Sequence, residues 1–268
     1  MHTLTTNGPL RLIQITDTHL LGPEDGRLLG MPTSQSLDCV LNSIRKQHPQ
    51  FDAFLVTGDL TQDGSEKSYQ HLHDVMSTFQ RPAFWLRGNH DEPSAMSKVA
   101  QGTEHLQRVI RNEHWQIIML NSQVEGAVFG ELAGEELEFL DYTLTEAPGL
   151  HTLVCLHHHP VSMNCAWIDP IGLRNSHEFM QLLSRHDNVR GVAWGHVHQA
   201  LEGVQDGIRL MATPSTCIQF EPNSDDFALD DQNPGYRWFE LHADGKFDTG
   251  VERVKGVHFE VDHSQTGY

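Results

Sequence analysis

Residues 83–91 read Ala-Phe-Trp-Leu-Arg-Gly-Asn-His-Asp, an apolar run that passes directly into a polar turn. The run from Ala83 to Leu86 has the apolar and aromatic character of a buried β-strand. The fragment Gly88-Asn89-His90-Asp91 then places an amide, an imidazole and a carboxylate where that strand ends. This stretch therefore predicts a strand whose carboxyl end presents chemically active side chains.

The same pattern of an apolar segment followed by a polar fragment recurs along the chain. The other fragments are Asp17-Thr18-His19 after 10–15, Gly58-Asp59 after 51–56, His157-His158-His159-Pro160 after 153–156, and Gly195-His196-Val197-His198 after 189–194. Side chains at the carboxyl ends of neighbouring strands can converge on one pocket from distant sequence positions. We expect these five fragments to build a single site.

Helical patterns separate the expected strands. Apolar residues at helical spacing predict helices over 33–48, 65–79, 134–144 and 176–184, and Ser65 is suited to cap the second of them. Further strands are expected near 208–212, 236–241 and 247–254, with a hairpin turn at 243–246. We expect one α/β domain over residues 1–268 with mixed sheets and a C-terminal hairpin at about 235–255.

Composition and charge narrow the classes of function. The formal net charge of the 268 residues is −18, and Lys and Arg form no cluster, which disfavours nucleic acid or a membrane surface as partner. A small anionic substrate remains compatible, because bound cations make one site positive on an acidic protein. The four scattered cysteines indicate reduced thiols and, with no apolar run long enough to span a bilayer, a cytoplasmic protein.

The residue types in the fragments are those of a metal centre. Carboxylate and amide oxygens mixed with imidazoles, without thiolates, suit first-row divalent ions used in hydrolysis, and iron, manganese, zinc and cobalt all accept this mixture. The pairs Asp17 with His19 and His196 with His198 are two residues apart, so in extended backbone each pair points to one side of a sheet. Asp59 could bridge two cations. The alternative is a buried, hydrogen-bonded polar cluster without metal.

The order of the five fragments resembles the calcineurin-like metallophosphoesterase superfamily from Leu12 to His198. The resemblance implies a four-layer αββα sandwich of mixed β-sheets flanked by helices, with two di- or trivalent metal ions, Fe and Mn being the metals it suggests. It implies one metal held by Asp17, His19, Asp59 and His198, and a second held by Asp59, Asn89, His158 and His196. The family motif His-x-Pro favours His158, but the triple histidine leaves His157 and His159 as alternatives.

The resemblance also implies the residues that meet the substrate. His90 would lie beside the phosphate and protonate the leaving alkoxide or stabilise its charge; the alternative is that it only orients the loop of Asn89. Asp91 would be a partner that orients a histidine, rather than a catalytic residue. Substrate contacts would come from the residues His19, Asp59, Asn89, His90, His198 and Asn175.

Residues 167–175 and 235–254 resemble the class III cyclic nucleotide phosphodiesterases and their glycerophosphodiesterase relatives. This resemblance implies hydrolysis of 3′,5′-cyclic AMP to 5′-AMP by a metal-bridging hydroxide, which lowers the level of a second messenger. Arg174 is a further candidate for substrate contact, and Trp167 is one of several aromatic residues able to stack on a base. The alternatives are a phosphodiesterase for glycerophosphodiesters or other small diesters, and a non-catalytic metal-binding scaffold. Monomer and homodimer are both compatible with the sequence.

Overall fold

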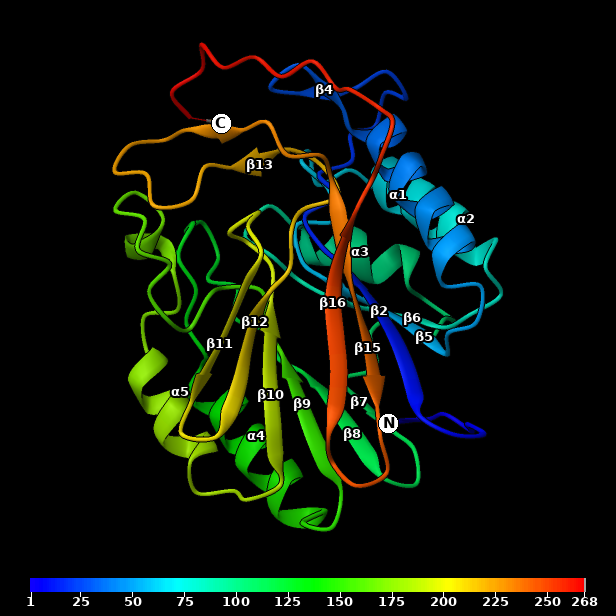
Figure 1. Cartoon of the computed structure of the whole chain (residues 1–268), viewed down its shortest axis with the longest axis vertical. Helices are drawn as coiled ribbons and strands as arrows, with labels where there is room; N and C mark the ends of the chain where they lie inside the picture. The colour runs from blue at the N-terminus through cyan, green and yellow to red at the C-terminus, as the bar shows by residue number, and fades with distance from the viewer. Residues whose placement is uncertain (268) are drawn as a thin grey trace.

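The computed structural model describes residues 1–267 and is built on two β-sheets (Figure 1). The five-stranded sheet has the order β16-β15-β2-β5-β6, with strands Phe247–Arg253, Gly235–Leu241, Leu10–Ile15, Ala53–Thr57 and Ala83–Leu86. The seven-stranded sheet has the order β1-β7-β8-β9-β10-β12-β11, with strands His2–Thr3, Val109–Arg111, Trp115–Met119, His151–Cys155, Val189–Trp194, Ile208–Ala212 and Leu201–Gln205. Because β2, β5 and β6 are parallel, and β8, β9 and β10 are parallel, each set brings its carboxyl ends to one edge.

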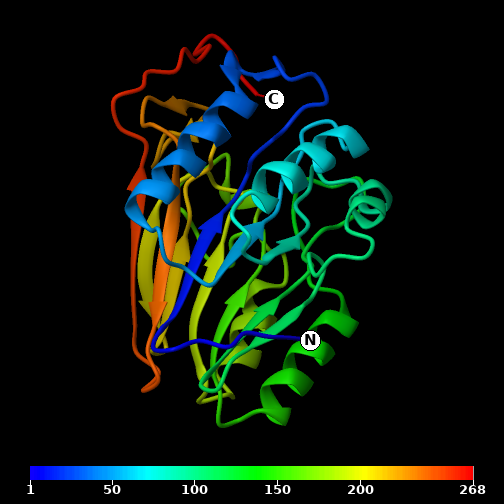
Figure 2. The same cartoon turned by 90° about the vertical axis from the view of Figure 1, so that its right-hand side faces the viewer.

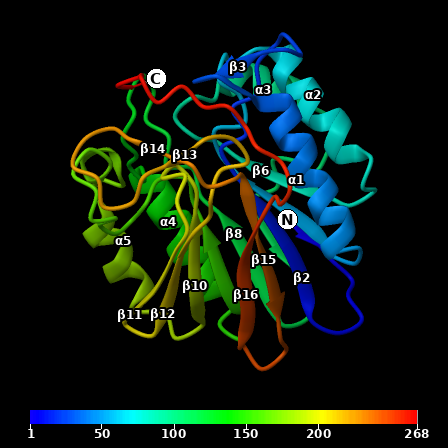
Figure 3. The ribbon, with the colours of Figure 1, turned by 45° about the horizontal axis from the view of Figure 1, so that its top comes forward.

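Helices cover the outer face of each sheet, so that the molecule has four layers (Figure 3). The helices α1 (Thr33–Gln47), α2 (Glu66–Ser77) and α3 (Pro93–Val99) share an apolar cluster with the five-stranded sheet. The helices α4 (Gly134–Glu146) and α5 (Ser176–Leu183) share another with the seven-stranded sheet. A third cluster lies between the sheets. The expected αββα architecture is confirmed.

The alternation of side chains along the central strands explains why their sequences are apolar throughout. In β2, Leu10 and Leu12 pack between the sheets, whereas Ile13 and Ile15 pack under the helices. Successive side chains of a strand point to opposite faces, and both faces of this sheet are covered. Each such side chain contributes about 1.5–3 kcal/mol by leaving water.

Most expected elements are present, with small shifts at their ends. β6, β10 and β12 have the expected bounds, and Ser65 caps α2 by accepting a hydrogen bond from the Ser68 amide at 3.2 Å. The sequence reading missed α3 and the strands β7, β8 and β11. The sequence does not predict β11, because this edge strand is mostly exposed and therefore lacks the apolar pattern of a buried strand.

Short segments cover the end of the sandwich where the carboxyl ends of the strands lie. They include β3 (Arg27–Leu28) with β4 (Met31–Pro32), and β13 (Gln219–Phe220) with β14 (Leu229–Asp230). The C-terminal tail also lies at this end, while the N-terminus is near the opposite end (Figure 2). Among residues 1–267, no helix has the length and apolar character needed to cross a bilayer.

Candidate metal centre

The polar fragments gather where the two sheets meet at the carboxyl ends of their strands. Those on the five-stranded sheet follow β2, β5 and β6, and those on the seven-stranded sheet follow β9 and β10. The side chains form overlapping groups whose ligand atoms lie within 4.8 Å of one another: Asp17, His19 and His198; His19, Asp59 and His90; Asp17, Asp59 and His157; and His157, His158 and His196.

The backbone of the fragments departs from the extended geometry that their spacing suggested. Asp17 and His19 have φ angles of 53° and 43°, His196 and His198 have 68° and 48°, and Asp59 has 50°. The prediction that these pairs lie in extended strand ends is therefore wrong. Non-glycine residues in this left-handed region cost free energy and persist where surrounding contacts impose them, often at functional sites.

The first group places two imidazoles against a carboxylate. The Nε2 atom of His198 lies 3.3 Å from Oδ1 of Asp17 and 3.2 Å from Nε2 of His19. The other nitrogen of each ring faces an oxygen: Nδ1 of His198 lies 2.9 Å from the carbonyl of Ile218, and Nδ1 of His19 lies 2.7 Å from Oε1 of Gln62. Since Nδ1 of each ring faces an oxygen that can only accept, Nε2 is the nitrogen directed into the group, as in an imidazole that binds a metal.

The second group contains Asp59, Asn89 and His157. Nε2 of His157 lies 3.2 Å from Oδ2 of Asp59 and 3.3 Å from Oδ1 of Asn89, while its Nδ1 donates to the carbonyl of Thr57 at 2.8 Å. The backbone amide of His90 donates to Oδ1 of Asp59 at 2.8 Å. Oδ2 of Asp59 also lies 3.9 Å from Nε2 of His19 in the first group, so its carboxylate is placed between the two groups, as a bridging ligand must be.

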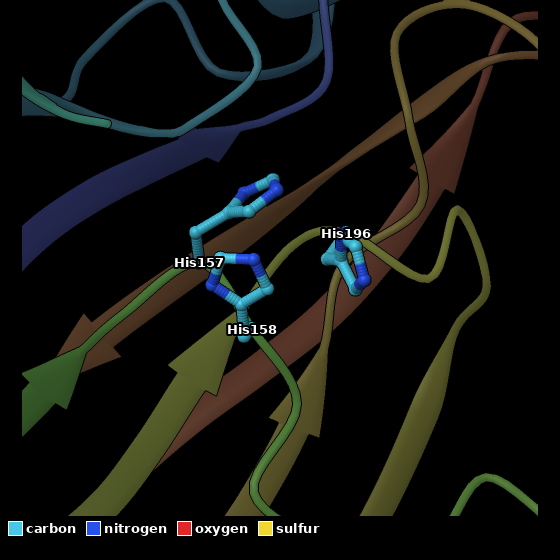
Figure 4. Close-up of side chains that lie close together, drawn as sticks. All are labelled: His157, His158 and His196. Atoms are coloured by element: carbon cyan, nitrogen blue, oxygen red, sulfur yellow. The ribbon is translucent and has the colours of Figure 1, made fainter. Parts of the chain in front are cut away.

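The adjacent residues His157 and His158 of the triple histidine hold their rings at 86° to each other, so the two rings face different partners (Figure 4). The ring of His157 faces Asp59 and Asn89, as described. His158 donates from Nε2 to the carbonyl of Val128 at 3.1 Å, and its Nδ1 lies 2.8 Å from Oγ of Ser122. Both of its nitrogens are therefore occupied, which differs from the expectation that His158 is the ligand.

His159 and His196 complete the histidine cluster. His159 is buried and stacks on His196, with 5.7 Å between ring centroids and 17° between planes. Its nitrogens have no hydrogen-bond partner among residues 1–267. His196 donates from Nε2 to the carbonyl of Ile171 at 3.1 Å, which leaves Nδ1 as the acceptor atom of its neutral ring.

Two glycines permit the two sheets to approach at the centre. A Cβ atom on Gly58, whose φ is 92°, would lie 2.3 Å from Nδ1 of His157 across the seam. A Cβ atom on Gly195 would lie 2.0 Å from Oγ1 of Thr16 and 2.7 Å from Oδ2 of Asp17. Each half of the centre therefore meets a glycine of the other half, where no side chain fits.

The carboxylates are ionised in spite of their burial. Burial raises the pKa of Asp17, but the nearby imidazoles of His198 and His157 outweigh it, so the pKa lies below its usual value. The pKa of Asp59 is lowered further, because the attraction of His157, His90 and His19 exceeds the effect of burial. The two charges are offset by imidazoles and provide anionic ligands.

The imidazoles fall into two classes. Burial lowers the pKa of His19 to about 3 and that of His196 well below its usual value, so both are neutral, the state that binds metal. His157 behaves oppositely: burial alone would lower its pKa, but Asp59 and Asp17 raise it to about 9. A cation bound beside Asp59 would displace the proton of His157.

The remaining sequence-predicted residues occupy different positions. His90 is half-buried, with its ring edge-on to that of His19 at 5.0 Å. Among residues 1–267, no histidine is hydrogen-bonded to Asp91; it accepts hydrogen bonds from the Gly88 amide at 2.9 Å, the Leu60 amide at 3.1 Å and the Tyr69 hydroxyl at 2.9 Å. Asp91 thereby ties the loop after β5 to the loop after β6, and the expectation that it supports a histidine is wrong.

In the loop before α5, the side chains predicted to contact substrate make contacts within the protein. The Asn175 side chain accepts from the Leu132 amide at 3.0 Å and donates to the Leu132 carbonyl at 2.8 Å. The Arg174 guanidinium lies over the ring of Phe129, 3.1 Å from its centroid. Trp167 packs against Phe220 and Phe227.

The groups that hold the imidazoles of this site were not predicted from the sequence. The Gln62 side chain faces Nδ1 of His19, and the Ser122 hydroxyl and the Val128 carbonyl contact His158. Gln62 lies three residues after Asp59, which is a weak signal, whereas Ser122 and Val128 come from a loop with no motif of its own.

The donor set fits two metal ions. Two ionised carboxylates, the amide of Asn89 and imidazoles with fixed tautomers meet in one buried seam, a combination suited to Fe, Mn, Zn or Co. Such a pair of ions could bind an anionic phosphate and activate water.

Comparison with known proteins agrees with this geometry. Residues 10–200 match the family model described as calcineurin-like phosphoesterase. The chain is 44% identical over 261 residues to the 3′,5′-cyclic adenosine monophosphate phosphodiesterase CpdA of Escherichia coli K12, covering 97% of this chain and 95% of that protein. It is 40% identical over 267 residues to the protein of the same name from Pseudomonas aeruginosa, covering 100% of this chain and 98% of that protein.

Solved structures support the fold at much lower identity. A dimetal phosphatase from Danio rerio superposes with a TM-score of 0.65 at 16% identity, covering 93% of this chain and 100% of that structure. Purple acid phosphatase PPD1 from yellow lupin also gives a TM-score of 0.65 at 13% identity, covering 96% of this chain and 53% of that structure. The chain belongs to the calcineurin-like phosphoesterase family.

Proposed function

We propose that this protein hydrolyses 3′,5′-cyclic AMP to 5′-AMP and thereby lowers the level of this second messenger. The observation that carries the proposal is the paired ligand set at the seam of the two sheets, in a chain that matches proteins named cyclic AMP phosphodiesterase along nearly its full length. The proposed substrate is a small anion, which suits a local cation site on a protein of net charge −18.

We assign one metal to Asp17, His19, Asp59 and His198, and the other to Asp59, Asn89, His157 and His196. His157 replaces His158 in this set, because Nε2 of His157 faces Asp59 and Asn89 whereas both nitrogens of His158 are hydrogen-bonded elsewhere. Two ions held there, with Fe and Mn as the first candidates, supply Lewis acidity that acidifies an attacking water and offsets charge on the phosphate.

In this proposal, residues of the chain position the metal ligands and protonate the leaving group. Asn89 brings a neutral oxygen to the site, so the ligands leave net positive charge for the phosphate. His90 is anchored by its amide to Asp59, with its half-buried ring beside His19, and we assign it proton donation to the departing ribose oxygen. A well-placed acid of this kind contributes about 10²–10⁴-fold to the rate. Asp91 fixes the relative position of the Asp59 and Asn89 loops.

The test is turnover by the purified protein, supplied with manganese and iron, on cyclic AMP, cyclic GMP, a glycerophosphodiester and an aryl diester. We expect preference for cyclic AMP and loss of that activity in Asn89→Ala. Hydrolysis of the aryl or glycerol diester without cyclic AMP would favour the broader phosphodiesterase. Metal binding with no turnover on any of the four would favour the scaffold.

We also propose a cytoplasmic location. All four cysteines, Cys39, Cys155, Cys165 and Cys217, are free thiols, which is typical of proteins kept in a reducing compartment. Cell fractionation tests this.

A further inference from the structure

Phe220 packs flat against His198, although it has no part in the chemistry proposed above. The centroids of the two rings lie 4.3 Å apart and their planes differ by 14°. Phe220 belongs to β13 and is 2% exposed. A buried aromatic ring therefore covers one face of an imidazole that we assign to a metal.

The stacked ring of Phe220 restricts a motion of the His198 ring that the hydrogen bond at Nδ1 leaves possible. Nδ1 of His198 is held by the carbonyl of Ile218 at 2.9 Å, and this bond fixes the position of one ring atom. The contacts of Nε2 with Asp17 and His19 lie at the edge of the ring, on the side where a cation would bind, and do not cover a ring face. The near-parallel ring of Phe220 covers one face and restricts tilting of the ring plane, because tilting would force the two rings into overlap. Phe220 therefore adds a restraint on the plane of His198 to the restraints on its edge.

Phe220 is itself held by aromatic neighbours from two segments. Trp167, in the loop before α5, lies edge-on to Phe220 with 4.9 Å between centroids. Phe227, in the hairpin of β13 and β14, lies 5.7 Å from Phe220 and 5.0 Å from Trp167. The backbone joins the same segments, since the Ala166 amide donates to the carbonyl of Ser224 at 3.2 Å. The plane presented to His198 is therefore fixed by packing.

We propose that Phe220 is a positioning residue for the metal centre: it holds the imidazole plane of His198 so that Nε2 meets the cation beside Asp17 and His19. The inference rests on the ligand set proposed above. It extends that set to the β13–β14 hairpin, which contacts the centre through the stack of Phe220 on His198 and follows directly on Ile218, whose carbonyl accepts from His198.

The test measures Mn²⁺ binding by chelator competition in the full-length protein, independently of activity. Phe220→Leu removes the ring but keeps a large apolar side chain. We expect one of the two Mn²⁺ sites to weaken about tenfold, within the range of about 10–100-fold seen when support of a ligand is lost. Phe179→Leu is the matched control, since Phe179 is 0% exposed in the same apolar cluster. Phe220→Tyr, which keeps the ring, should restore the affinity.

A double-mutant cycle tests whether Phe220 acts through His198. In a His198→Ala background, Phe220→Leu should weaken Mn²⁺ binding no further. Unchanged affinity in Phe220→Leu, an equal loss in Phe179→Leu, or a full second loss in the His198→Ala background would overturn the proposal. Wild-type affinity in His198→Ala alone would instead remove His198 from the ligand set. Melting temperatures of the metal-free variants show whether folding is intact, and Phe220→Met replaces the Leu variant if that variant does not fold.

Discussion

The two sheets contribute different chemistry to the centre. The five-stranded sheet supplies every oxygen ligand of the proposed set, Asp17, Asp59 and Asn89, together with His19. The seven-stranded sheet supplies only imidazoles, His157, His196 and His198. The proposed centre therefore does not exist on either sheet alone.

The division of ligand types between the two sheets explains how the buried charges are stabilised. On the five-stranded sheet, the charge of Asp59 raises the pKa of Asp17. On the seven-stranded sheet, the clustered imidazoles lower the pKa values of His158 and His196. Across the seam the signs become favourable, since His198 and His157 lower the pKa of Asp17 and Asp59 raises that of His157. Packing the sheets together brings the compensating groups within reach.

The largest effect is expected from Asp59→Asn, which removes the carboxylate shared by both metals. We expect loss of most bound metal and a fall in turnover of about 10³-fold or more, because the charge that holds both cations is gone. Metal content by elemental analysis and turnover measure this. Asp52→Asn, at the opposite end of β5, is the control and should keep both. Retention of both metals in Asp59→Asn would contradict the assignment of Asp59 as the carboxylate shared by the two metals.

The next test separates adjacent imidazoles. His157→Ala should lose one metal, whereas His158→Ala should keep both and weaken them about 10-fold at most, because His158 contacts the ligands His157 and His196 only through its ring. Metal stoichiometry after dialysis measures the difference. A larger loss in His158→Ala would return the ligand role to His158.

His90→Ala distinguishes holding the metals from using them. We expect both metals to remain and turnover to fall about 10²–10⁴-fold, as for loss of a general acid. An aryl diester with a good leaving group should suffer less than cyclic AMP, since its departure needs no proton. If metal is lost in this variant, His90 is a ligand.

Gly195→Ala probes the seam itself. The added Cβ meets Thr16 and Asp17 across the sheets, and overpacking of this kind costs about 1–3 kcal/mol. We expect a lower melting temperature together with weaker Mn²⁺ binding. Gly203→Ala, where a Cβ meets open space, is the control. Equal stability of the two variants would show that the sheets can separate slightly at the centre without loss.

The smallest effect concerns a buried imidazole outside the centre. His105 stacks on Trp85 at 4.0 Å, and burial lowers its pKa below the usual 6.5. Because the unfolded chain then binds a proton more readily, folding stability is full above about pH 6.5 and declines as the pH falls below it. Denaturant titrations at pH 7.5 and 5.5 should show a smaller decline in His105→Phe than in the wild type. An identical decline in the two proteins would contradict the lowered pKa of His105 as a source of this pH dependence.

Much of this molecule could be predicted from particular residues. The apolar runs of β6 and β10 gave their exact bounds, and the polar fragments behind the strands do converge. The choice between His157 and His158 could not be made, because adjacent rings differ only in which partners the fold brings to them. The resemblance of its loop predicts that Asn175 contacts substrate, whereas its side chain is hydrogen-bonded to the backbone of Leu132.

The order of the short motifs indicates the family and, through that resemblance, the four layers and the residue types of the centre, because motifs are properties of short segments. Which imidazole faces Asp59, and that Phe220 covers His198, can be seen in the packed molecule alone. The same holds for the left-handed backbone of Asp17, His19, Asp59, His196 and His198. These features depend on contacts between segments that lie far apart in the sequence or on different sheets. Such contacts select among conformations that each segment alone leaves open.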